Sequence, residues 1–207
     1  MTLDNLVALS WSIGIPVVHL RIFPWPHKRM AAMTVRIGAQ SFVLLAKDAM
    51  YPAWIAFYLA HELAHIALAH IAADQALVDF DDGGGQPATD SDEEERAADA
   101  WALELLTGRP NPNVVTSDGA ASASELARVA LSSAHELGIE PGTLALCFGY
   151  STGLWAVANS SLKGIYGAPA PVWLAINSFA RTQLALAQST TDASDFLEDV
   201  LELGAVE

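Results

Sequence analysis

Two histidines and a glutamate in the segment HELAH, residues 61–65, have the types and spacing best suited to chemistry. Residues four apart lie on one face of a helix, so His61 and His65 can direct their imidazoles toward one ion. Neutral imidazole suits zinc, with Zn–N distances of about 2.0–2.1 Å. Glu62 lies about 100° further round the helix, where its carboxylate can take a proton from a water molecule that attacks an amide carbonyl. The pattern predicts a Zn²⁺ site at His61 and His65, with Glu62 as the catalytic base.

The alternative for this motif is a chance match on an apolar helix. Burying three ionisable groups without a ligand would be costly, which favours the metal site. The apolar run over residues 49–73 is also long enough to span a bilayer. However, it contains the motif, and no Lys or Arg occurs over residues 48–95 to anchor a membrane helix. We therefore expect a buried core helix, with an intramembrane metalloprotease as the less favoured alternative.

A catalytic zinc site needs a third protein ligand and one open position. The extended motif H-E-x-x-H-x-x-G-x-x-H is absent, because Ala67 and Ile71 stand where it has glycine and its last histidine. His70 falls one residue early and is expected to lie off the metal-facing side of the helix. The third ligand should therefore come from another segment.

The acidic segment that opens the next predicted helix is the clearest donor. Glu95 and Asp99 are four residues apart, so one carboxylate can bind the metal while the other accepts a hydrogen bond from a ligand histidine. Glu93 and Glu94 have no acid at that spacing. The alternative is an ordinary acidic first turn that complements the helix dipole. We predict that Glu95 is the third ligand and that Asp99 orients a histidine.

The sequence leaves open which group would stabilise the oxyanion of the tetrahedral intermediate. The candidate donors are Tyr51, Tyr58, Tyr150, Tyr166, His70 and Arg96. A second His-Glu pair, at residues 135–136, has isoleucine at position 139 and predicts only a helix end at Gly138. Residues 125–149 have the rhythm of a helix-turn-helix but few basic residues, which favours a helical covering subdomain over DNA binding.

Hydrophobic and turn-forming residues together predict an α+β fold. A helix is expected at residues 3–13, strands at 15–23, 33–38 and 40–47, and the HELAH helix at 52–73. A surface loop at 79–95 leads into a helix that ends at Gly108. Further helices are expected at 122–137, 141–148, 151–162, 171–187 and 193–203. We predict a small three-stranded antiparallel sheet packed on the HExxH helix, forming a metallopeptidase core at residues 1–110, and a helical subdomain at 111–207.

Composition limits the classes of partner. The 207 residues carry a formal charge of −14, which repels nucleic acid phosphates, and 52% are hydrophobic, enough for a core. One cysteine, Cys147, cannot form an internal disulfide. Asp4 stands where a secretory signal would be cationic, so we expect a cytoplasmic protein. The acidic loop does not have the spacing of an EF-hand, which disfavours a calcium site.

Two segments carry a resemblance to a known family. AFYLAHELAHIALAH at residues 56–70 and ERAADAWALELL at 95–106, after an N-terminal helix and a G-I-x-V strand, resemble the ImmA/IrrE family of gluzincin-like metallopeptidases. The resemblance covers about residues 1–110. The family pattern, roughly E-x-E-A-[ND]-x-F-A-x-x-L-L, implies Glu95 as ligand and Asp99 at its Asn/Asp position. The chain departs from it at Ala97, at Trp101 and at residues 107–108, none of which is an implied metal ligand.

The resemblance also implies a role. Members commonly cleave, or relieve the action of, a helix-turn-helix repressor in a stress response or a mobile element. We therefore expect a zinc-dependent endopeptidase that acts on a separate repressor protein, without binding nucleic acid or a membrane. The alternative is a metal-binding regulatory protein that acts by partner binding without proteolysis.

Overall fold

The computed structural model describes residues 1–21, 30–80, 93–109 and 122–184, together with residues 192, 195, 197, 199 and 201. Its described residues form an α+β fold. The helices are α1 (Leu3–Ser12), α2 (Pro52–Ala67), α3 (Glu93–Thr107), α4 (Ala123–Leu137), α5 (Pro141–Thr152), α6 (Trp155–Tyr166) and α7 (Val172–Gln183). The strands are β1 (Val17–His19), β2 (Met30–Ile37), β3 (Gln40–Leu45) and β4 (Gln75–Phe80).

Within the part of the chain that the structure describes, the sheet has four strands in the order β1-β3-β2-β4, one more than the sequence predicted. Strands β2 and β3 form an antiparallel hairpin, and β4 pairs antiparallel with the other side of β2. Because β2 is thereby paired on both sides, β1 joins the free side of β3, and it does so in parallel. The sheet is therefore mixed. Of the loop expected at 79–95, Asp79 and Phe80 belong to β4 and residues 93–95 belong to α3, whereas residues 81–92 lie outside the described residues.

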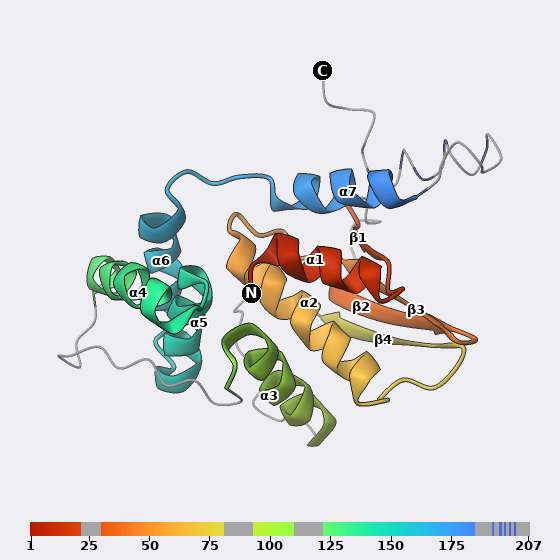
Figure 1. The fold of residues 1–207 in the computed structure, drawn as a ribbon, viewed down its shortest axis with the longest axis horizontal. Helices are drawn as coiled ribbons and strands as arrows, with labels where there is room; N and C mark the ends of the chain where they lie inside the picture. Colours follow the sequence, from red (N-terminus) through yellow and green to blue (C-terminus); the bar gives the residue numbers. More distant parts are fainter. Residues whose placement is uncertain are drawn as a thin grey trace.

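Helix α2 is the central element of the core. It packs against β2 and β3 on one side and against α1 and α3 on others, as Figure 1 shows. The buried residues it shares with the sheet, α1 and α3 are apolar. They include Leu6, Val17, Ala32, Val43, Leu45, Ile55, Leu59, Leu63, Ala102 and Leu106. The predicted core helix is thus confirmed, and no helix among the described residues is long and apolar enough to cross a membrane.

Helix α2 ends at Ala67, six residues before the predicted end. The amide of His70 donates to the carbonyl of His65 at 3.0 Å, across Ala69, whose φ is 59°. This bonding is the Schellman ending of a helix, which usually places glycine at the left-handed position. Alanine at 69 gave no such signal, so the sequence pattern extended the helix too far. The turn directs His70 back toward the helix.

The C-terminal helices pack in two places (Figure 1). Helices α4, α5 and α6 form a cluster, and α5 contacts α2, whereas α7 contacts β1 and α1. Trp54 of α2 packs against Trp155 of α6 with the two rings tilted, and the Trp54 indole N–H donates to Asn159 at 2.7 Å. The predicted boundary at residues 110–111 and most of the predicted helix at 193–203 lie outside the described residues. The division into two units stays a prediction.

Candidate metal centre

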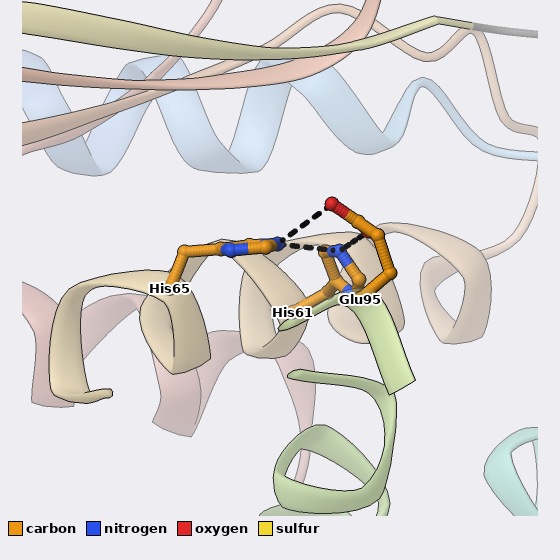
Figure 2. Close-up of side chains that lie close together, drawn as sticks. All are labelled: His61, His65 and Glu95. Atoms are coloured by element: carbon orange, nitrogen blue, oxygen red, sulfur yellow. Dashed lines mark hydrogen bonds and ion pairs between the residues drawn. The ribbon is translucent and has the colours of Figure 1, made fainter. Parts of the chain in front are cut away.

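His61 and His65 lie one turn apart on α2 and are almost fully buried. Their Nε2 atoms are 2.9 Å apart (Figure 2). Glu95, in the first turn of α3, places Oε2 3.2 Å from the Nε2 of His61 and Oε1 3.7 Å from the Nε2 of His65. One possible ligand atom from each residue lies within 4.8 Å of the others. These three residues are therefore placed to hold a metal ion.

The hydrogen bonds behind the two imidazoles fit this use. The Nδ1 of His61 lies 2.9 Å from Oδ1 of Asp99, so it donates there and leaves Nε2 with a lone pair. The Nδ1 of His65 lies 3.0 Å from the Nδ1 of His70. When the Nδ1 of His65 donates to His70, the Nε2 of His65 also carries a lone pair. The lone pairs of both Nε2 atoms and of the Glu95 carboxylate then face one another, and they repel unless a cation lies between them. Ligand atoms of a tetrahedral zinc site lie about 3.3 Å apart, given bonds of about 2.0–2.1 Å, so the set fits Zn²⁺.

A proton can take the place of the ion at His61. Burial alone would lower the pKa of His61, but its hydrogen bonds with Asp99 and Glu95 outweigh burial and raise that pKa to about 10. The same bonds from His61 and His65 hold the pKa of the Glu95 carboxyl well below its usual range. The metal-free site is therefore an imidazolium–carboxylate pair at neutral pH, and a metal ion must displace its proton.

Glu62 is 1% exposed and lies where α2 packs on β2. Its Oε2 accepts a hydrogen bond from the hydroxyl of Thr34 at 2.5 Å. Its Oε1 is buried and has no hydrogen-bond partner among the described residues. Burial, followed by the negative charge of Asp79, raises the pKa of Glu62. A cation at the neighbouring histidines would oppose this shift and favour the carboxylate that a base requires.

The structure thus brings together the predicted residues His61, Glu62, His65, Glu95 and Asp99. Their placement on α2 and α3 follows from the extensive packing between these two helices. The first-turn acids of α3 also suit its N-terminal dipole, so the expected acidic turn and the metal-facing Glu95 coexist. The chemical role of each residue stays a prediction.

Sequence reasoning missed three contacts of the site. His70 lies behind His65 and contacts its Nδ1, away from the Nε2 atoms of the site. Asp79 on β4 places Oδ2 3.5 Å from the Nε2 of His61. Thr34 on β2 holds Glu62. The Asp79 contact depends on the pairing of β4 with β2, and the Thr34 contact depends on the packing of α2 against β2. No local sequence pattern indicates either contact.

Three of the candidate oxyanion donors are engaged elsewhere. Tyr51 stacks on Tyr166, and the Tyr166 hydroxyl donates to Glu140 at 2.6 Å. Burial and the adjacent Glu140 raise the pKa of Tyr166, so this phenol stays protonated. Tyr150, on α5, lies beside Asp99, and burial, followed by the negative charge of Asp99, raises the pKa of the Tyr150 phenol. Tyr150 therefore brings the α4–α6 cluster close to the carboxylate behind His61.

Comparison with known proteins gives one family match. The model of the family Peptidase U49 matches residues 23–150, which is more than half of the chain. The matched range runs from before β2 to Tyr150 and contains every residue of the site described above. No curated protein and no solved structure matches the chain. The match supports a peptidase, whereas the resemblance to the ImmA/IrrE family stays a prediction.

Proposed function

Because the chain belongs to the peptidase U49 family, we propose that it is a zinc-dependent endopeptidase with its active centre at His61, His65 and Glu95. One observation carries the proposal: two imidazoles and a carboxylate from two helices converge within 4.8 Å of one another. Nitrogen and oxygen ligands from two histidines and a glutamate are a common catalytic zinc set.

The chemistry divides between the ion and the chain. Zinc, when bound, would polarise the carbonyl of the scissile bond and make water more acidic. Glu62 supplies the base: its unpartnered Oε1 accepts the proton of the attacking water and can return it to the leaving amine. Asp99 orients the His61 imidazole, and His70 orients the His65 imidazole, each by contact with the Nδ1 atom of that ligand.

We further propose that the substrate is a separate protein, a helix-turn-helix repressor of a stress response or a mobile element. The support is the resemblance of residues 56–70 and 95–106 to the ImmA/IrrE family. The net charge of −14 also disfavours a direct role on nucleic acid and favours a basic partner. Partner binding without proteolysis is the second candidate.

The test separates catalysis from metal binding through Glu62→Gln. A quenched-fluorescence peptide library, screened with zinc-loaded protein, supplies the cleavable probe. We expect Glu62→Gln to lower kcat about 10²- to 10⁴-fold while keeping its metal. Glu136→Gln, in the exposed His-Glu pair of α4, is the matched control and should cleave normally. Wild-type cleavage by Glu62→Gln would overturn the proposal, and metal binding without any cleavage by the wild type would favour partner binding.

A further inference from the structure

Thr34 occupies a central position of the sheet, paired with a strand on each side. It lies in the middle of β2, opposite Val43 of β3 and Leu77 of β4, so its backbone is paired on both sides. It is 0% exposed. A side chain on such a strand is placed more accurately than one on a loop, which suits a residue that must hold another group in position.

A hydroxyl group is unusual at the fully buried position of Thr34. Ala32 and Val43, its neighbours on the same face of the sheet, are apolar and fully buried, so valine would be the ordinary core residue. Burying a hydroxyl costs free energy unless it makes a hydrogen bond. The Thr34 hydroxyl donates to Glu62 Oε2 at 2.5 Å, a contact between a central strand and the HELAH helix.

This contact makes the two carboxylate oxygens of Glu62 unequal. Oε2 is occupied by Thr34, whereas Oε1 is buried without a hydrogen-bond partner among the described residues. A carboxylate held through one oxygen cannot rotate freely to offer either. A buried acceptor without a partner is costly, and such groups in native proteins commonly have a ligand or catalytic role.

We propose that Thr34 is the positioning residue of the base: its hydroxyl fixes Glu62 through Oε2 and presents Oε1 to the reacting water. The inference deepens the proposed function and rests on it, since it takes Glu62 as the base. The hydroxyl does not touch the substrate and acts only through the geometry of the Glu62 carboxylate.

The kinetic test compares kcat for two substitutions of Thr34. Their order differs according to whether Thr34 positions Glu62 through its hydroxyl or only fills space in the core. Thr34→Val keeps the shape and removes the hydroxyl, whereas Thr34→Ser keeps the hydroxyl and leaves a small cavity. We expect Thr34→Val to lower kcat about 10- to 100-fold at unchanged KM and zinc content, because a displaced base loses its alignment. Thr34→Ser should stay within about threefold of the wild type. A residue needed only for packing would give the reverse order, with serine the poorer variant.

A second test needs no substrate and no metal. Urea unfolding of the metal-free protein is measured for Thr34→Val, Glu62→Met and the double variant. Thr34→Val should lower the urea midpoint in the wild-type background, because Glu62 Oε2 loses its donor. In the Glu62→Met background, Thr34→Val should leave the urea midpoint unchanged or raise it, because neither polar group of the pair then remains. Equal shifts in both backgrounds would show that the two side chains are not coupled and would overturn the inference.

The outcomes for Thr34 and for the proposed function are distinguishable. Wild-type kcat in Thr34→Val, with Glu62→Gln inactive, overturns the role of Thr34 and leaves the peptidase standing. Cleavage by Glu62→Gln overturns the peptidase mechanism itself. Reduced kcat in Thr34→Val, rescued by Thr34→Ser at equal zinc content, supports the inference.

Discussion

At the scale of single residues, the candidate metal centre depends on the groups that contact the Nδ1 atoms of His61 and His65. His61 is held by the Asp99 carboxylate, and the Nδ1 of His65 lies 3.0 Å from the Nδ1 of His70. A hydrogen bond donated from the Nδ1 of an imidazole leaves its Nε2 available to an ion. The i,i+4 spacing made the convergence of the two histidines predictable from sequence, whereas the contact of His70 depends on a turn.

Zinc binding should release a proton from His61. Its pKa is raised to about 10 in the metal-free fold, above its ordinary 6.5, so the ring is charged at neutral pH and must lose a proton to bind the ion. Apparent zinc affinity should therefore rise as pH rises toward 10. Titration calorimetry at pH 7.5 in buffers of different ionisation enthalpy should give at least about one proton per zinc. Binding without proton release would contradict this account of the site.

His70→Ala should weaken zinc binding about 10- to 100-fold, because the Nδ1 of His65 loses its partner. Chelator competition measures the dissociation constant. His135→Ala, an exposed histidine of α4, is the matched control and should bind zinc as the wild type does. Equal affinity in the two variants would show that His70 does not orient His65.

At the scale of elements, the sequence predicts helices and hairpins with local patterns, but it does not predict a strand that only long-range pairing identifies. The HELAH helix, the helix that carries Glu95 and the β2–β3 hairpin follow from spacing, composition and a glycine turn at Gly38. Strand β4 was missed because only its pairing with β2 identifies it, and Asp79 was missed with it. The early end of α2 was missed because alanine occupies the left-handed position at residue 69.

Ala69→Gly should stabilise the fold by about 0.5–1 kcal/mol, since glycine adopts the left-handed conformation without steric cost. Ala67→Gly, within the last turn of α2, should instead destabilise it by about 0.5–1 kcal/mol. Urea unfolding of the metal-free protein compares the two variants. A loss of stability in Ala69→Gly would mean that the Schellman ending does not form.

At the scale of the whole molecule, the helical cluster packs next to the candidate metal centre. Helix α5 contacts α2, and its Tyr150 lies beside the Asp99 carboxylate that contacts His61. The family match runs past the predicted boundary at residue 110 and ends at Tyr150. The sequence predicted a covering subdomain, but no local pattern could indicate which of its side chains reaches the site.

Tyr150→Phe should weaken zinc binding about 2- to 10-fold, because it removes the hydroxyl beside the Asp99 carboxylate, a polar contact of about 0.5–1.5 kcal/mol. Tyr166→Phe is the contrasting variant, because its hydroxyl bonds to Glu140 at the start of α5 and does not contact the site. It should lower stability and leave zinc affinity unchanged. Identical zinc affinities for the two variants would argue against coupling through Tyr150.

Metal content, measured by plasma mass spectrometry on the wild type, Glu95→Ala and Glu104→Ala, shows directly whether His61, His65 and Glu95 hold a metal ion. Glu104 is an exposed glutamate on the same helix and serves as the matched control. We expect about one zinc per chain in the wild type and in Glu104→Ala, and a sharp reduction in Glu95→Ala. Full zinc content in Glu95→Ala would contradict the third ligand, and no metal in the wild type after reconstitution would contradict the centre itself.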